Sequence, residues 1–373
     1  MKKNIIFLII SVLLFPIENI SQQKQTEKIN TNKFRQLNQE FASPNMFRTA
    51  SGAPGPAYYQ QQADYIINIE LDDANKKIYG DEIVTYTNNS PDLLDYLWVQ
   101  LDQNVRSKDS PSLIRDSNSV NPAYIPDTFE KEFINDPFDG GFNIEYVRDT
   151  NDKPLDYFVN QTMMRIDLPK AIGTGESFSF KVKWWYNIND HVNDGGRSGY
   201  ETFPNDDNRA YIIAQFFPRM CVYDEVEGWQ NYQFWGDGEF ALPFGNYEVN
   251  ITVPADHIME ATGKLVNRKD VYSKEMMKRF NKAKKSYDKP VIIVSQEEAE
   301  IAEKSFSKDK KTWKFYAENV RDFAFATSRK YILDMMAVKI GNEDKMAVSL
   351  YPKEGNPMWE DFSTITVMET LKF

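Results

Sequence analysis

Apolar and polar side chains alternate along much of this 373-residue chain, and this alternation restricts its fold more than any other feature. In residues 65–71 the odd positions hold Tyr, Ile, Ile and Leu, with Asn68 and Glu70 between them. Because successive side chains of a β-strand point to opposite faces, the pattern predicts a half-buried strand. Similar alternation returns in four further segments, residues 78–86, 97–101, 178–186 and 247–253.

Turn-forming residues separate these segments. Residues 72–77 join the first two, the cluster at 88–91 (Asn-Asn-Ser-Pro) ends the second, and Pro254 ends the last. Hydrophobic residues make up 41% of the chain, which is enough to fill a core. We therefore expect a mainly β fold, an antiparallel, saddle-like β-sandwich with a few short helices.

Two segments have helical rather than alternating patterns. Residues 273–286 place Met276, Phe280 and Ala283 on one helical face, and Ser273 is a suitable N-cap. Residues 319–328 predict a second helix, which begins with Asn319, also a suitable N-cap.

A strongly basic stretch surrounds the first of these helices. Residues 264–289 contain ten basic and three acidic side chains. A basic amphipathic helix can bind membranes or acidic partners. The interpretation we favour is a solvated helix inserted into a hairpin.

The N-terminus has the features of a secretory signal peptide, expected to span residues 1–21. Lys2 and Lys3 precede an apolar run at 5–15 that is too short to span a bilayer. The alternative is an N-terminal membrane anchor. Residues 22–54 are expected to form a polar tether. No second long apolar segment follows, so we expect an exported protein, periplasmic or extracellular, without stable membrane insertion after signal removal.

Several common kinds of site lack the residues they need. The net charge of −11 argues against nucleic acid as a partner. No G-x-S-x-G or nucleotide-binding glycine motif occurs. The lone Cys221 lies in an apolar, aromatic run, which favours a buried, inert thiol. One cysteine also excludes an intrachain disulfide.

Metal ligands are equally scarce. The two histidines, His191 and His257, stand far apart in the sequence without an H-E-x-x-H motif, and both are expected in surface loops. Calcium bound by Asp194, Asp206 and Asp207 is conceivable, but solvated loop acids are the favoured interpretation.

Longer runs of the sequence resemble a known family. The clearest are residues 214–225, with Gly228 and Trp229 after them, and residues 238–255 leading into 261–265. Residues 320–328 and the opening segments at 63–71 and 80–88 extend the similarity. Together they resemble the N-terminal domain of secreted bacterial relatives of aminopeptidase N, a zinc metallopeptidase family. The resemblance covers about residues 55–373.

The resemblance implies a domain organisation. In this family a β saddle, here residues 55–355, packs on a thermolysin-like domain that carries a G-x-M-E-N-type loop and the H-E-x-x-H zinc helix. Neither motif is present here. Residues 356–373, with a helix starting near Pro357, resemble the start of that catalytic domain. We therefore expect the non-catalytic part of an enzyme that removes N-terminal residues from peptides.

This expectation extends to cofactors and partners. The chain itself is expected to have no catalytic residue, no metal and no activity, with zinc in the parent enzyme. Its partners would be the C-terminal thermolysin-like catalytic domain and a peptide substrate.

One substrate-binding residue follows from the family's pattern. A Gln or Glu of the N-terminal domain lines the pocket for the substrate's N-terminal residue, and Gln215 matches that position. The family's second polar position corresponds to Phe217, which departs from the pattern and puts recognition of the free amine in doubt. Arg219 and Tyr223 could brace the domain interface, although structural packing is the favoured role.

The alternative function is a free-standing, exported binding module for peptide or glycan. Aromatic side chains can stack on sugars, and the candidates are Trp184, Trp185, Trp229 and Trp235. Such residues are more often anchors of a core or an interface.

Overall fold

The computed structural model describes residues 44–112, 126, 129–130, 134, 138–196, 198–236, 238 and 240–372. The chain divides into two compact units, residues 1–56 and 57–373. In the first unit, Arg48 pairs with Pro54 across a short turn. The predicted signal peptide and most of the predicted tether lie outside the described residues, and the remaining description concerns the second unit.

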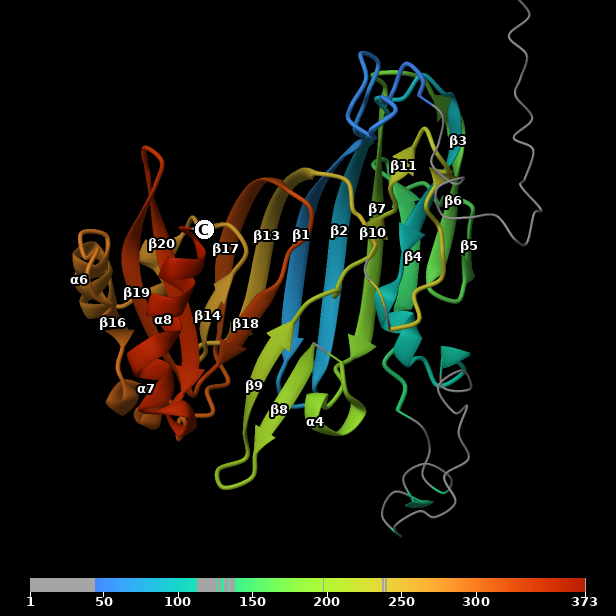
Figure 1. The fold of residues 1–373 in the computed structure, drawn as a ribbon. Coiled ribbons are helices and arrows are strands. Elements are labelled where there is room, and N and C mark those ends of the chain that lie inside the picture. Colours follow the sequence, from blue (N-terminus) through green and yellow to red (C-terminus); the bar gives the residue numbers. More distant parts are fainter. Residues whose placement is uncertain are drawn as a thin grey trace, which may run out of the picture. The chain divides into compact units, whose positions relative to one another are not determined.

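A seven-stranded sheet forms the centre of the second unit, with the strand order β15-β17-β13-β1-β2-β7-β4 (Figure 1). Neighbouring strands are antiparallel except β1 and β13, which run parallel. The strands are β1 (Gln62–Asp72), β2 (Lys77–Thr87), β4 (Asn143–Asp149), β7 (Ser177–Asn187), β13 (Gly245–Pro254), β15 (Lys264–Leu265) and β17 (Lys310–Val320). The predicted alternation is visible in their burial, since every second side chain of β1, from Ala63 to Leu71, is buried.

Smaller sheets complete the β structure. One has the order β10-β3-β6-β5, another β14-β18-β9-β8, a third β16-β19-β20, and β11 pairs with β12. The strands are β3 (Leu94–Gln100), β5 (Tyr157–Asn160), β6 (Met163–Ile172), β8 (Gly199–Phe203), β9 (Asn208–Ile213), β10 (Arg219–Met220), β11 (Tyr223–Asp224), β12 (Gly228–Trp229), β14 (Ile258–Ala261), β16 (Val291–Val294), β18 (Phe325–Ser328), β19 (Tyr331–Ile340) and β20 (Glu343–Pro352).

The helical elements are short. Those with both ends in the described part of the chain are η2 (Asp102–Arg106), α4 (His191–Asp194), α5 (Arg268–Val271), α6 (Lys274–Ala283), α7 (Gln296–Ala302), η3 (Lys353–Gly355) and α8 (Met358–Thr370). Ser273 caps α6 by accepting a hydrogen bond from the Met276 amide, as predicted. A helix also begins after Pro357, as predicted. The mainly β, antiparallel fold with a few short helices is therefore confirmed.

The helix predicted at residues 319–328 is wrong. Strand β17 continues to Val320, and β18 begins at Phe325. Asn319 adopts a left-handed backbone conformation (φ 53°) rather than capping a helix. Phe323 and Phe325 are buried on either side of exposed Ala324, so the local pattern has the period of a strand. Tertiary burial of the two rings outweighs the weak helical preference of the segment.

One large hydrophobic cluster connects the central sheet to its neighbours. It includes Val84 and Phe180 of the seven-stranded sheet, Leu97 and Met164 of the β3–β6 sheet, and Phe216 of the connecting segment. In the part of the chain that the structure describes, no helix is long and apolar enough to cross a membrane.

Candidate functional site

Gln215 lies in a bend directly after β9. Its backbone has a left-handed conformation (φ 55°), and its carbonyl oxygen accepts a hydrogen bond of 2.9 Å from Nε2 of Gln103. The next carbonyl, that of Phe216, accepts a 3.1 Å hydrogen bond from the indole of Trp184. The half-buried Gln215 carboxamide forms no hydrogen bond with any residue that the structure describes. The backbone is therefore held in place while the side chain remains available.

Phe217, two residues further on, faces the core. It is completely buried, and its ring makes edge-on contacts with Tyr65 and Tyr247 at centroid distances of 5.4 and 5.9 Å. Its ring is therefore part of the core and is not available at the surface. The bend thus presents one polar side chain, not the pair that the family's pattern contains.

Arg219 anchors the segment that follows. Its guanidinium lies 2.8 Å from a carboxylate oxygen of Asp102 and 2.7 Å from one of Asp322. Burial alone would lower the pKa of Arg219. The two carboxylates have a larger, opposite effect and raise this pKa, so the guanidinium stays ionised. Tyr223 donates to Asp92 at 2.8 Å. Both residues make intramolecular contacts that fix the position of β10 and β11.

The backbone of Gln215 supports a stability prediction. A left-handed conformation costs an L-residue roughly 1 kcal/mol but costs glycine almost nothing. We expect Gln215→Gly to keep or raise the thermal midpoint and Gln215→Ala to leave it nearly unchanged, because the side chain has no internal partner. Differential scanning calorimetry of both variants would measure this. A drop of several degrees for Gln215→Ala would show that the carboxamide is structural.

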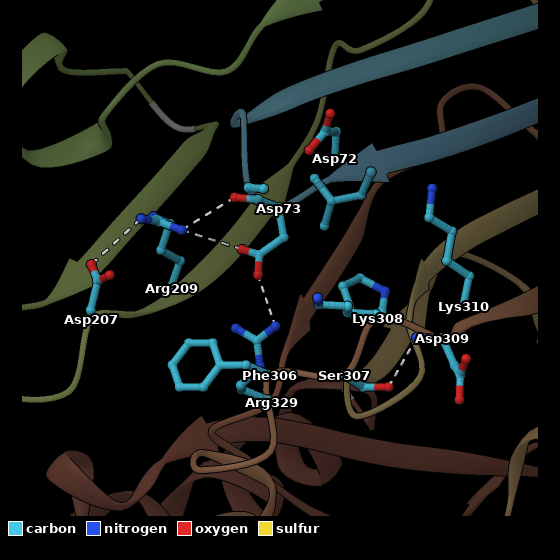
Figure 2. A pocket seen from close by; sticks show the side chains of 13 residues that line it. Asp72, Asp73, Asp207, Arg209, Phe306, Ser307, Lys308, Asp309, Lys310 and Arg329 are labelled. Carbon is cyan, nitrogen blue, oxygen red and sulfur yellow. Dashed lines mark hydrogen bonds and ion pairs between the residues drawn. The ribbon is translucent and has the colours of Figure 1, made fainter.

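A cavity of about 460 Å³ opens near the β1–β2 turn, at some distance in sequence from Gln215 (Figure 2). Asp73 is central to its polar wall. Its carboxylate accepts 2.7 Å and 2.8 Å hydrogen bonds from Tyr211 and Arg329, and Arg209 lies 3.6 Å away. Its lining residues are Leu71, Asp72, Asp73, Ala74, Asp207, Arg209, Pro254, Phe306, Ser307, Lys308, Asp309, Lys310 and Arg329.

The charges around this cavity largely satisfy one another. Burial opposes ionisation of Asp73, but the hydrogen bonds from Tyr211 and Arg329 outweigh it and lower its pKa. The lining contains four acidic and four basic side chains, so it favours neither anions nor cations. Sequence analysis missed this cluster because its members come from separate segments with no local motif. We interpret it as an ion-pair network that joins the β1–β2 turn to β9 and β18.

His257 lies beside this network and is completely buried, so its predicted surface position is wrong. Its Nδ1 is 3.2 Å from the hydroxyl of Thr327, and its ring contacts that of Tyr211. Burial, reinforced by the charge of Arg329, lowers the pKa of His257 to about 4, so the ring is neutral at pH 7. His191, in contrast, is exposed at the start of α4, as predicted.

Three carboxylates have the spacing of a metal site. Among the described residues, ligand atoms of Asp206, Glu303 and Glu354 lie within 4.8 Å of one another. The Nζ of Lys330 occupies the space between them, at 2.5, 3.1 and 2.8 Å. The ammonium group takes the role of the cation. Asp207 faces Arg209 instead.

The described residues therefore do not fit the sites considered for calcium or for catalytic zinc. Zinc activation of water needs three protein ligands, usually histidines with a carboxylate, and an open fourth position. His257 is buried and neutral beside Thr327, and His191 is exposed on α4. Cys221 is buried, which raises the pKa of its thiol and disfavours the thiolate that binds metal.

The tryptophans considered for glycan stacking are mostly internal. Trp184 and Trp229 are buried. Trp185 is half-buried, and the ammonium of Lys77 lies 4.4 Å from its ring centroid. Trp235 is also half-buried. None of the four tryptophans is therefore fully exposed.

Helix α8 has apolar side chains on both faces. Thr364 and Met368 are buried, and Met368 packs with Met336, Val338 and Ala347 of the β19–β20 hairpin. A second face is exposed, with Met358 and Phe362 each 62% accessible. Trp359 and Ile365 add to this exposed apolar surface. The helix also carries Glu360, Asp361 and Glu369, so its exposed surface is apolar only in part.

Comparison with solved structures finds M1 zinc metallopeptidases. One from Deinococcus radiodurans is 10% identical, with 79% of this chain and 47% of that chain covered and a TM-score of 0.41. A two-domain M1 zinc metallopeptidase mutant bound to L-tryptophan is 10% identical, with coverages of 80% and 50% and a TM-score of 0.42. The chain thus spans about half the length of these structures.

The other two comparisons add no relative. No family model matches the sequence, and no curated protein matches it. A TM-score near 0.4 does not establish a shared function, so the functional assignment depends on the residues of this chain.

Proposed function

We propose that this chain is the N-terminal, non-catalytic β part of an exported zinc aminopeptidase-type protein. Its activity would require a C-terminal thermolysin-like domain that holds the zinc. The exposed apolar face of α8 carries this proposal, because the helix directly follows the β structure and has the composition of an interface. The sequence runs that resemble the aminopeptidase N family support it.

In this proposal, Gln215 contributes to binding the N-terminal residue of a peptide substrate. A carboxamide can accept a hydrogen bond from an ammonium group and donate one to a carbonyl. The anchored backbone and the unengaged side chain of Gln215 suit such a role. The buried ring of Phe217 leaves the substrate amine without a second polar partner from this segment.

The gene downstream of codon 373 provides the first test of this function. An open frame that encodes an H-E-x-x-H motif is expected. In the extended protein, zinc and aminoacyl-anilide hydrolysis should appear together, and Gln215→Ala should weaken turnover without lowering the thermal midpoint. A stop codon with no peptidase frame beside it would contradict the proposal. So would stoichiometric zinc and chelator-sensitive turnover in the 373-residue chain.

The apolar face of α8 leads to a prediction for the isolated chain. An inter-domain face buries about 600–1,500 Å², and its exposure should cause self-association and binding of an apolar dye. We expect the double variant Met358→Ser, Phe362→Ser to reduce both, because it removes the two most exposed apolar side chains of the helix. Light scattering and dye fluorescence would measure the change.

A matched control for this experiment is Ile301→Ser, since Ile301 is 72% exposed and belongs to a different helix, α7. It should leave association unchanged. If the unmodified chain is a monodisperse monomer that binds no dye, the α8 face is not an unoccupied interface.

A further inference from the structure

The basic stretch noted in the sequence forms an ordered row of lysines on α6. Lys274, Lys278 and Lys282 follow one another at intervals of four residues, and Lys285 lies in the turn after the helix. With 3.6 residues per turn, these spacings place Lys274, Lys278 and Lys282 on one face of the helix, over about 12 Å, and Lys285 follows directly after its end. We call these four residues the lysine stripe.

The lysine stripe points away from the protein. Met276, Phe280 and Ala283 occupy the opposite face of α6 and are buried in the main hydrophobic cluster. All four lysines of the stripe are exposed. Figure 1 shows α6 beside β16, at the edge of the β16-β19-β20 sheet. The apolar face is thus already used, and the charged face is available to a partner.

The charges of the stripe are almost uncompensated. Lys274, Lys282 and Lys285 form no ion pair with any residue that the structure describes, and Lys278 has only a 3.7 Å contact with exposed Glu275. Many other lysines are paired, for example Lys183 with Glu145 at 2.7 Å. Residues 264–289 carry a net charge of +7 in a chain of net charge −11. Such a concentration of unpaired charge favours a polyanionic partner.

We propose that the lysine stripe is a docking surface for an anionic lipid bilayer. A row of point charges, three on one helix and one in the turn after it, can face several headgroups of a flat surface at once. Clusters of four to eight basic side chains on an amphipathic helix are a recognised feature of binding to anionic lipids. The buried apolar face excludes insertion of α6, so the association is peripheral and electrostatic.

Nucleic acid fits the lysine stripe less well. Single-stranded nucleic acid is usually held by aromatic rings that stack on bases, together with arginines that match phosphate geometry. The stripe contains neither. The negative charge of the rest of the chain does not prevent docking, because at 0.1 M salt the Debye length is about 10 Å and distant charges are screened.

Vesicle sedimentation with the purified chain tests this inference. We expect retention by phosphatidylcholine vesicles that contain one-third phosphatidylglycerol, and no retention by phosphatidylcholine alone. Each lysine near an anionic surface strengthens binding about fivefold, so changing all four to glutamine should weaken it by roughly a hundredfold or more. Raising the salt to 1 M shortens the Debye length to about 3 Å and should release the protein.

The control variant changes four exposed lysines outside the stripe to glutamine, namely Lys153, Lys170, Lys304 and Lys314. It has the same net charge as the stripe variant and should bind vesicles as the unmodified chain does. Circular dichroism and thermal midpoints show whether both variants fold. Equal binding to neutral and anionic vesicles would overturn the inference. It would also fail if the two variants bound equally, or if the stripe bound a single-stranded oligonucleotide more tightly than vesicles.

This inference is independent of the proposed function. Vesicle binding needs neither zinc nor a second domain, so the presence or absence of aminopeptidase activity in an extended protein does not affect the outcome.

Discussion

Replacing Lys330 with methionine is expected to lower the free energy of unfolding by about 3–5 kcal/mol, the usual cost of removing one partner from a buried ion pair. The Lys330 side chain is completely buried, and its ammonium contacts the carboxylates of Asp206, Glu303 and Glu354. Without it, the buried carboxylate of Glu303 and the partly exposed carboxylates of Asp206 and Glu354 would remain close together, with only Lys353 beside Glu303.

The pH dependence of the Lys330 network has a defined sign. Burial lowers the pKa of Lys330, but its hydrogen bonds to the three carboxylates outweigh this and raise it above the ordinary value. Its contribution is therefore complete below the unfolded pKa, near 10.4, and is lost as the pH rises through the folded value. Between pH 6 and 9 the unmodified network should show no pH dependence from this group.

A cation and a matched variant make this experiment specific. In Lys330→Met the three carboxylates are expected to bind calcium, so calcium should raise the thermal midpoint of the variant and not that of the unmodified chain. Lys353→Met is the control, because Lys353 contacts Glu303 at 2.7 Å but is partly exposed; it should cost less than about 1 kcal/mol. If Lys330→Met is as stable as the unmodified chain, the network does not stabilise the fold.

Replacing Glu82 with leucine should have the opposite effect and raise the free energy of unfolding by about 2–3 kcal/mol at pH 7. Glu82 is 2% exposed in the middle of the central sheet, opposite Ile67 and Val182 of the neighbouring strands. Neither carboxyl oxygen has a hydrogen-bond partner among the described residues. Leucine removes these unsatisfied groups and keeps a similar volume.

The same residue should make the stability of the unmodified chain depend on pH. Burial, with a smaller contribution from Asp81, raises the pKa of Glu82 well above its usual range. The folded state therefore keeps a proton that the unfolded state releases above pH 4.3 or so. Stability should fall as the pH rises from there toward the raised folded pKa, by at most about 1.4 kcal/mol per pH unit.

Two further variants separate the pH effect from packing. Glu82→Gln cannot titrate, so it should lose the part of the pH dependence that comes from Glu82. It should gain less stability than the leucine variant, because the amide is also unsatisfied. Asp81→Asn removes the neighbouring charge and should leave most of the pH dependence in place. Urea unfolding at several pH values would measure all three. A Glu82→Leu variant that unfolds more easily than the unmodified chain at pH 7 would indicate a hidden partner for the carboxylate.

Much of the β structure could be predicted because its information is local. In β1, β7 and β13 the alternation of side chains matches the alternation of buried and exposed positions. Helix α6 was equally predictable, since Ser273 and the spacing of Met276 and Phe280 lie within a few turns. The segment 319–328 shows the limit, because its local pattern was ambiguous and burial of Phe323 and Phe325 decided it.

The description of the candidate site depended on both the sequence and the tertiary structure. The resemblance indicated Gln215, but only the structure shows that its backbone is anchored by Gln103 and that the ring of Phe217 points into the core. His257 is a clearer case: a polar residue after Pro254 suggests an exposed turn, yet neighbouring elements cover it completely.

By itself, then, the sequence determined strands β1, β2, β3, β7 and β13, helix α6 with its lysines, and the absence of the H-E-x-x-H zinc motif. Only the tertiary structure decided which charges meet. Asp73 and Arg329 are 256 positions apart, and the carboxylates around Lys330 come from three separate segments. The periodicity of apolar side chains depends on residues a few positions apart in the sequence. An ion pair, in contrast, forms wherever the packed sheets bring opposite charges together and exclude water.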